Sequence, residues 1–194
     1  TLGKELPAKA LDEILTDHAE VFTELKEYYK QTSESETTKI SFYEDTYSLY
    51  NLYRFSHYYE EAYGKYIWLK SGASLVIEHT EAMTVIDVNT GSVLKKKKQE
   101  DTLFYQINRE AAKEIARQLR LRNISGIIMI DFINMKDTAQ KEKLLSLLDS
   151  ECKKDRVHCN VIDMTALNLV EMTRSKVRKP LHEQIRSCMK NNRS

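Results

Sequence analysis

The sequence predicts an α/β layered fold, and three observations lead to that prediction. Short apolar runs of strand length alternate with longer amphipathic segments through residues 66–194. Apolar residues make up 41% of the chain and charged residues 30%, which is typical of a soluble globular protein and not of a disordered one. At 194 residues, the chain is long enough for one large domain or for two small ones that share a core.

The first part of the chain, residues 1–65, is rich in tyrosine and in predicted helices. Its tyrosines have two interpretations, stacking on RNA bases or packing within a small subdomain, and we favour packing. The elements predicted here are a strand over 11–15, a helix over 18–30 that Asp17 can cap, a polar loop over 31–37, a strand over 39–43 and a helix over 50–63.

The second part of the chain contains the alternation of strands and helices. Gly64 breaks the preceding helix, and Ser71 with Gly72 predicts a turn. The predicted strands cover residues 74–79, 83–88, 126–131, 158–164 and 169–173. The predicted helices cover residues 108–121, 138–152 and 180–188, and Pro180 can open the last of them.

Two of these apolar strands end on a carboxylate, Asp87 and Asp131. Sites in α/β sheets lie at the carboxyl ends of strands, so we expect the two acids to lie side by side. Oxygen ligands at close range suit Mg²⁺, with Mn²⁺ as a substitute. Asn89 lies two residues past Asp87, on the same side of an extended chain, where its amide can orient Asp87. The alternative is that each acid only caps a turn or a helix.

Any surface that binds RNA has to be local, because the net charge of +1 excludes a basic field over the whole molecule. One candidate is a run of four lysines, which either grips phosphates or forms a solvated loop: Lys95, Lys96, Lys97 and Lys98. Three arginines lie near the end of the helix over 108–121, and at least two of them are expected to compensate its C-terminus: Arg117, Arg120 and Arg122.

Histidines and cysteines give no sign of a further site. His79, His158 and His182 lack the spacing of metal ligands, so each is expected at the surface or satisfied in the core. The three cysteines fit a reducing cytosol, which predicts a cytoplasmic protein. No apolar run approaches the roughly 20 residues of a membrane span. The chain begins with Thr and not Met, so we expect a piece of a longer protein.

Five runs of residues, all between 68 and 174 and in one order, resemble the ribonuclease E/G family of bacterial endoribonucleases. A weaker match covers residues 11–65. The resemblance implies a ribonuclease-H-like subdomain over residues 1–65, packed on a deoxyribonuclease-I-like catalytic subdomain with a mixed sheet over residues 66–194. The five runs are Trp68–Glu78, Thr80–Gly91, Asn108–Arg122, Ile127–Met135 and Leu169–Arg174.

The function that the resemblance implies is Mg²⁺-dependent hydrolysis of single-stranded RNA in RNA processing or decay, with 3′-hydroxyl and 5′-phosphate products. Asp87 and Asp131 match the magnesium-binding aspartates of the family, and Asn89 matches the asparagine that supports them. His158 falls where the family has a basic residue near the scissile phosphate, although a histidine holds its charge less firmly at pH 7 than Arg or Lys.

The sequence departs from the family pattern in ways that affect RNA binding and assembly. The oligonucleotide-binding barrel and the 5′-end sensor of the family are not found before Leu11, so we expect weak RNA binding and slow cleavage by this chain alone. Cys188 stands near the first cysteine of the zinc link that joins family protomers, but it has no partner cysteine nearby. The zinc-linked tetramer of the family is therefore not expected, and the resemblance leaves a homo-oligomer open. Substituted family positions are Asn134, Ala166 and Asn168.

Two other functions stay open on the sequence alone. One is an RNA-binding or scaffolding module with weak or no catalysis, and the other is a metal-dependent nuclease that prefers DNA. The discriminating residues are Asp87 and Asp131, because a scaffold has no need for both carboxylates at the ends of apolar strands.

Overall fold

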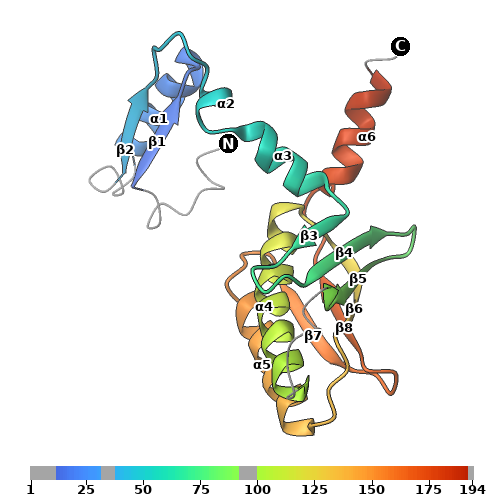
Figure 1. Cartoon of the computed structure of the whole chain (residues 1–194). Helices are drawn as coiled ribbons and strands as arrows, with labels where there is room; N and C mark the ends of the chain where they lie inside the picture. The colour runs from blue at the N-terminus through green and yellow to red at the C-terminus, as the bar shows by residue number, and fades with distance from the viewer. Residues whose placement is uncertain (1–11, 32–37, 92–99, 192–194) are drawn as a thin grey trace. The chain divides into compact units, whose positions relative to one another are not determined.

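The structure is a computed structural model that describes residues 12–31, 38–91 and 100–191 (Figure 1). Its helices and mixed sheet confirm the predicted α/β class. The chain divides into two compact units, Thr1–Tyr58 and Tyr59–Ser194. The division falls within helix α3 (Phe55–Tyr63), whereas the boundary expected from the sequence follows residue 65.

The first unit contains a small parallel sheet with one helix between its two strands. The rings of Phe22 on this helix and Phe42 on the second strand lie 5.3 Å apart, which fixes the helix against the sheet. The elements of this unit before α3 are β1 (Glu13–Thr16), α1 (Ala19–Lys30), β2 (Lys39–Phe42) and α2 (Leu49–Leu52).

The single helix predicted over 50–63 is wrong, because the structure has α2 and α3 in its place. Arg54 lies between them with a φ of +50°, in the left-handed region that a right-handed helix cannot include. Ser48 caps α2 by accepting a hydrogen bond from the Asn51 backbone N–H. The apolar spacing across this region therefore serves two short helices.

The second unit is built on a six-stranded mixed sheet. The neighbours β5 and β6 run parallel, and every other pair in this sheet is antiparallel. The short edge strand β3 was not predicted from the sequence. In spatial order, the strands are β3 (Tyr66–Trp68), β4 (Ser74–His79), β5 (Met83–Asn89), β6 (Gly126–Asp131), β8 (Leu169–Arg174) and β7 (Cys159–Met164).

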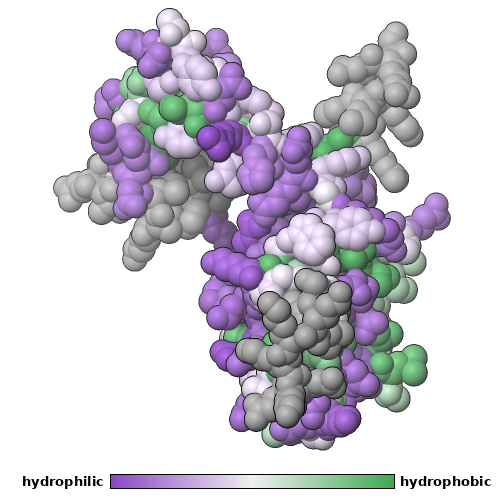
Figure 2. Space-filling model, in the orientation of Figure 1, coloured by the Kyte–Doolittle hydropathy of each residue, from purple (hydrophilic) through white to green (hydrophobic). Residues whose placement is uncertain are grey.

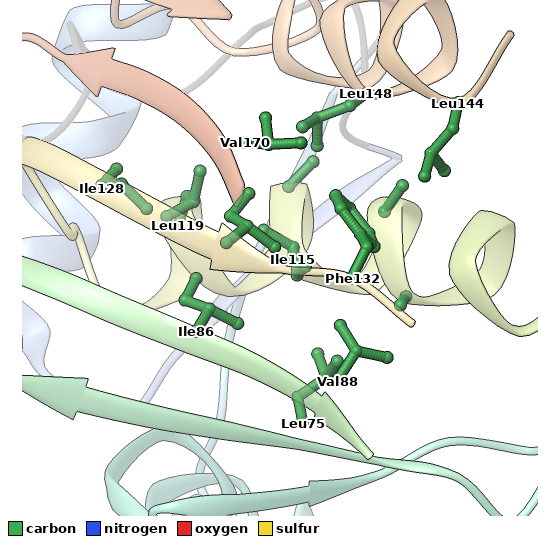
Figure 3. Packing of buried hydrophobic residues seen from close by; sticks show 14 of the residues in the cluster. Leu75, Ile86, Val88, Ile115, Leu119, Ile128, Phe132, Leu144, Leu148 and Val170 are labelled. Atoms are coloured by element: carbon green, nitrogen blue, oxygen red, sulfur yellow. The ribbon is translucent and has the colours of Figure 1, made fainter. Parts of the chain in front are cut away.

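Two long helices, α4 (Glu100–Leu121) and α5 (Thr138–Cys152), lie side by side on one face of this sheet (Figure 1). The core lies between them and the sheet, where alternate strand residues such as Ile86, Ile128 and Val170 are buried (Figure 3). Burying each such side chain contributes about 1.5–3 kcal/mol. The strands thus turn one set of side chains toward the helices and the intervening set the other way.

We call the second side of the sheet the open face, defined by Val76, Val85, Asp87, Met129 and Asp131. These residues alternate with buried ones along β4, β5 and β6, and they are half-buried or exposed. In Figure 2, the hydrophobic residues visible on this unit gather mainly on the side away from α4 and α5. The open face is therefore the surface on which strand residues can meet a ligand.

The helices of this unit fit the predicted ones, except that one begins eight residues earlier and the last ends three residues later. α5 has the predicted bounds, and Asp137 caps it by accepting a hydrogen bond from the Ala139 N–H at 2.9 Å. α4 begins at Glu100, eight residues before the predicted start at Asn108. A last helix, α6 (Leu181–Asn191), follows Pro180 as expected. Within the described ranges, no helix has the length and apolar character that a membrane span requires.

Candidate metal centre

The two carboxylates predicted to form a site end neighbouring strands of the open face. β5 and β6 are parallel, and their register places Asp87 directly opposite Asp131. Parallel strands lie about 4.8 Å apart, so the two side chains emerge next to each other at the same end of the sheet. Asp87 is half-buried and Asp131 is exposed. Both carboxylates therefore face solvent and not the hydrophobic core.

The buried neighbours of these acids hold them in place. Ile86 and Val88 flank Asp87, and Ile130 and Phe132 flank Asp131, and all four hydrophobic side chains belong to the core. A one-residue slip in register would exchange the buried and exposed sets, so the packing of the strands fixes the direction of the carboxylates.

Asn89 supports Asp87 as expected from its position two residues further along β5. Its side-chain Nδ2 donates a hydrogen bond to Oδ2 of Asp87 at 2.7 Å. A hydrogen bond to one carboxylate oxygen limits rotation of the group and leaves the other oxygen for a ligand. This bond orients Asp87.

Charge repulsion makes the pair receptive to a cation. Partial burial and the negative charge of Asp87 raise the pKa of Asp131 above its ordinary value. A divalent ion between the carboxylates would remove that repulsion. In the described ranges, no group of three or more His, Cys, Asp or Glu side chains could hold a metal ion. Two carboxylates with open positions for water fit Mg²⁺, which keeps several of its waters in proteins.

Asn108 is a further residue of the site, and sequence reasoning missed its role. It is fully buried within α4, where its Nδ2 donates to the Ile133 carbonyl at 2.7 Å and its Oδ1 accepts from the Ile133 N–H at 3.0 Å. Ile133 lies two residues past Asp131, so this pair of bonds fixes the chain where β6 leaves the sheet. The signal in the sequence is a polar residue on the apolar stripe of a helix, but the predicted helix begins at this residue and so does not include it in the stripe.

The structure does not bring His158 to the carboxylate pair. His158 precedes β7, whose first residue Cys159 is paired with Arg174, which in turn lies opposite Gly126 at the start of β6. Asp131 lies at the other end of β6, five residues away, which corresponds to roughly 16 Å along a strand. The role of His158 in RNA binding stays a prediction. His158 lies too far from Asp131 to contact a phosphate held at the carboxylate pair.

Other basic groups named from the sequence have different positions. The run Lys95, Lys96, Lys97 and Lys98 lies outside the described residues, as does the side chain of Cys188. Arg117 pairs with Glu61 and Glu114, and Arg122 is buried against the Gln118 side chain and the Glu61 carbonyl. These arginines connect α4 to α3.

Comparisons with known proteins show which family the whole chain resembles. The sequence pattern described as Ribonuclease E/G family matches residues 2–177. Ribonuclease G of Escherichia coli K12 is 38% identical over 171 residues, which cover 88% of this chain and 35% of that protein. Ribonuclease G of Haemophilus influenzae is 39% identical over the same coverage of each chain. Ribonuclease E of a Nostoc species is 34% identical over 176 residues, 89% of this chain and 26% of that protein. The chain thus spans about a quarter to a third of the length of these curated relatives.

Proposed function

The chain belongs to the ribonuclease E/G family, and we propose that it is the catalytic region of a Mg²⁺-dependent endoribonuclease. The proposed substrate is single-stranded RNA, cut in cytoplasmic RNA processing or decay to leave a 3′-hydroxyl and a 5′-phosphate. Asp87 opposite Asp131, on the solvent side of two parallel strands, is the observation that carries the proposal. We assign a ribonuclease-H-like subdomain to residues 1–65 and a deoxyribonuclease-I-like subdomain to residues 66–194 from the resemblance.

In this proposal, each residue of the site has one task. Asp87 and Asp131 hold the ion, and Asn89 keeps the Asp87 carboxylate in the orientation that its 2.7 Å hydrogen bond defines. When bound, Mg²⁺ supplies positive charge that stabilises the developing charge on phosphate oxygens and makes water a better nucleophile. The hydrophobic side chains beneath the pair keep both carboxylates fixed, which avoids reorganisation during the reaction.

The test removes the charge of each acid without changing its shape. We expect Asp87→Asn and Asp131→Asn each to reduce Mg²⁺-dependent cleavage of a labelled single-stranded RNA by about 100-fold or more, because one carboxylate cannot hold the ion as two do. Glu142→Gln is the matched control, since Glu142 is an exposed acid on α5, which packs on the other face of the sheet. Mn²⁺ binding, measured by electron paramagnetic resonance, should be lost together with cleavage in both site variants. The control should keep both Mn²⁺ binding and cleavage.

The same assay separates the alternative functions. A chain that binds RNA and leaves it intact with Mg²⁺ or Mn²⁺ would be a binding or scaffolding module. A DNA oligonucleotide of matched sequence, if cut faster than RNA, would indicate a DNA nuclease. Ligation of the downstream fragment, which requires a 5′-phosphate, tests the proposed product ends. Cleavage that is unchanged in Asp87→Asn would place the reaction elsewhere.

A further inference from the structure

The edge strand β3 carries two exposed aromatic side chains on the same side of the sheet as the carboxylates. Tyr66 is paired with Val76, Val76 with Asp87, and Asp87 with Asp131, so one row of residues crosses four strands. Directly paired residues project from the same face of a sheet. Tyr66 is 61% exposed, so its ring is available on the open face.

The next row along the strands brings in the second aromatic residue. Trp68 is paired with Ser74, and Ser74 with Asn89. Trp68 is 73% exposed, although tryptophan is usually well buried. Tyr66 is two strands from Asp87, and Trp68 is two strands from Asn89, a separation of about 10 Å in each case. That separation suits a nucleotide next to the one whose phosphate lies at the metal centre.

The charges on the open face favour an RNA chain that runs from the carboxylate pair toward β3. The row on the other side of the carboxylate pair joins Glu78, Val85, Met129 and Glu171, and Glu171 is in turn paired with Asp163. Glu78 forms an ion pair with Lys65, which leaves Glu171 and Asp163 in that row to repel RNA phosphates. The row of Trp68, Ser74 and Asn89 carries no formal charge. A phosphate chain is therefore directed from the carboxylate pair toward β3.

A groove beside Trp68 offers positive charge to the same chain. Its volume is about 420 Å³, and it lies between β3 and α4. Lys70 and Lys113 line it, both are exposed, and neither forms an ion pair with any residue that the structure describes. Three acids also line the groove. Arg117 forms ion pairs with two of them, Glu61 and Glu114, and the carboxylate of the third, Glu110, accepts hydrogen bonds from the backbone N–H groups of Lys70 and Ser71. The two lysines can therefore neutralise phosphates.

We propose that Tyr66 and Trp68 form a stacking platform for RNA bases adjacent to the scissile phosphate, and that Lys70 and Lys113 hold the phosphates that follow. Every base has a flat π-face, so such a platform binds single-stranded RNA without reading its sequence. A duplex, whose bases are already stacked on each other, cannot use it. This inference rests on the proposed nuclease function, and it adds how the substrate is held.

Trp68 is the only tryptophan of the chain, so its fluorescence reports on the platform directly. In EDTA, where RNA stays intact, we expect a single-stranded oligonucleotide to quench this fluorescence. An oligonucleotide of the same length without bases should bind through its phosphates and leave the fluorescence nearly unchanged. Trp68→Ala should weaken RNA affinity by roughly 5- to 100-fold, measured by anisotropy of a labelled RNA, and Trp68→Phe should retain most of the affinity.

Ile162→Ala is the matched control, because Ile162 is an exposed hydrophobic residue on the opposite edge strand. It should leave RNA affinity unchanged. The proposal is overturned if RNA binds without altering Trp68 fluorescence, or if Trp68→Ala changes self-association of the protein and not its affinity for RNA. Quenching by RNA in a protein that never cleaves would support the platform and reject the nuclease. Normal cleavage without quenching would support the nuclease and reject the platform.

Discussion

Asp131 is a residue of the proposed metal centre whose negative charge destabilises the folded protein when no cation is bound. Partial burial and the neighbouring Asp87 raise its pKa, so the folded state holds the Asp131 proton more tightly than the unfolded state does. Stability linked to this group is present at low pH and is lost as the pH rises through the raised pKa. At neutral pH without a cation, Asp131 therefore lowers the free energy of unfolding.

Removing this charge should stabilise the metal-free protein. In EDTA at pH 7, we expect Asp131→Asn to raise the melting temperature by a small amount, on the order of 1–3 °C, and the gain should shrink as the pH is lowered toward 4. Mg²⁺ should raise the melting temperature of the parent, because it binds only the folded state, and should not raise that of the variant. Thermal melts of both proteins at each pH, with and without Mg²⁺, provide the measurement. A variant less stable than its parent in EDTA at pH 7 would contradict the argument.

Single residues show where sequence reasoning succeeds at this scale. Asp87 and Asp131 could be paired in advance because each ends an apolar run, and strand ends of a sheet lie at a common edge. Asn89 followed from the two-residue period of a strand. His158 could not be placed, because its distance from the pair depends on which end of the sheet β7 starts from. The local sequence contains no information on that point.

Helix α4 and the segment after β6 depend on one buried asparagine. Replacing Asn108 by Ala would leave the N–H and C=O groups of Ile133 without their partners in a half-buried position. We expect the free energy of unfolding to fall by about 2–4 kcal/mol. Cleavage should also slow in the fraction that stays folded, because the chain just past Asp131 loosens. Urea unfolding and the RNA assay measure the two effects.

Gln106→Ala provides the control on the same helix, since Gln106 is exposed and Ala favours a helix. Its free energy of unfolding should stay within about 0.5 kcal/mol of the parent. If Asn108→Ala is no less stable than Gln106→Ala, the hydrogen bonds to Ile133 do not contribute to the stability of the fold.

At the scale of elements, the sequence was most informative where periodicity was long. α5 has its predicted bounds, and in the structure Asp137 caps its start. β3 was missed because its three residues are Tyr, Ile and Trp, which show no alternation of apolar and polar side chains. The break between α2 and α3 was missed because it occurs at Arg54, which adopts a left-handed conformation. Glycine or asparagine at that position would have indicated a break, whereas arginine does not.

The order of strands in the whole sheet was beyond the sequence pattern. β8 lies between β6 and β7, so the last two strands form a hairpin whose second member joins the sheet. Apolar runs identify strands but do not specify neighbours, because any of them can bury the same face. The row from Tyr66 to Asp131 exists only once that order is fixed. For this reason, the carboxylate pair was predictable and the aromatic platform was not.

The two units of the molecule should differ in local stability. In the first unit, the buried hydrophobic residues are Leu25, Tyr29 and Leu49, among those the structure describes. The second unit buries a large continuous core between its sheet and α4 and α5. Local opening costs less where little apolar surface is exposed by it.

Hydrogen exchange read by mass spectrometry measures this difference. We expect amides of β5, β6 and the middle of α4 to exchange slowest, and those of β1, β2 and α1 to exchange at least about 10- to 100-fold faster. Addition of Mg²⁺ should slow exchange further at the carboxyl ends of β5 and β6, where the cation joins Asp87 to Asp131, and should leave β1 and β2 unchanged. Equal protection of β1 and β6 would mean that the first unit draws its stability from something other than its own buried side chains.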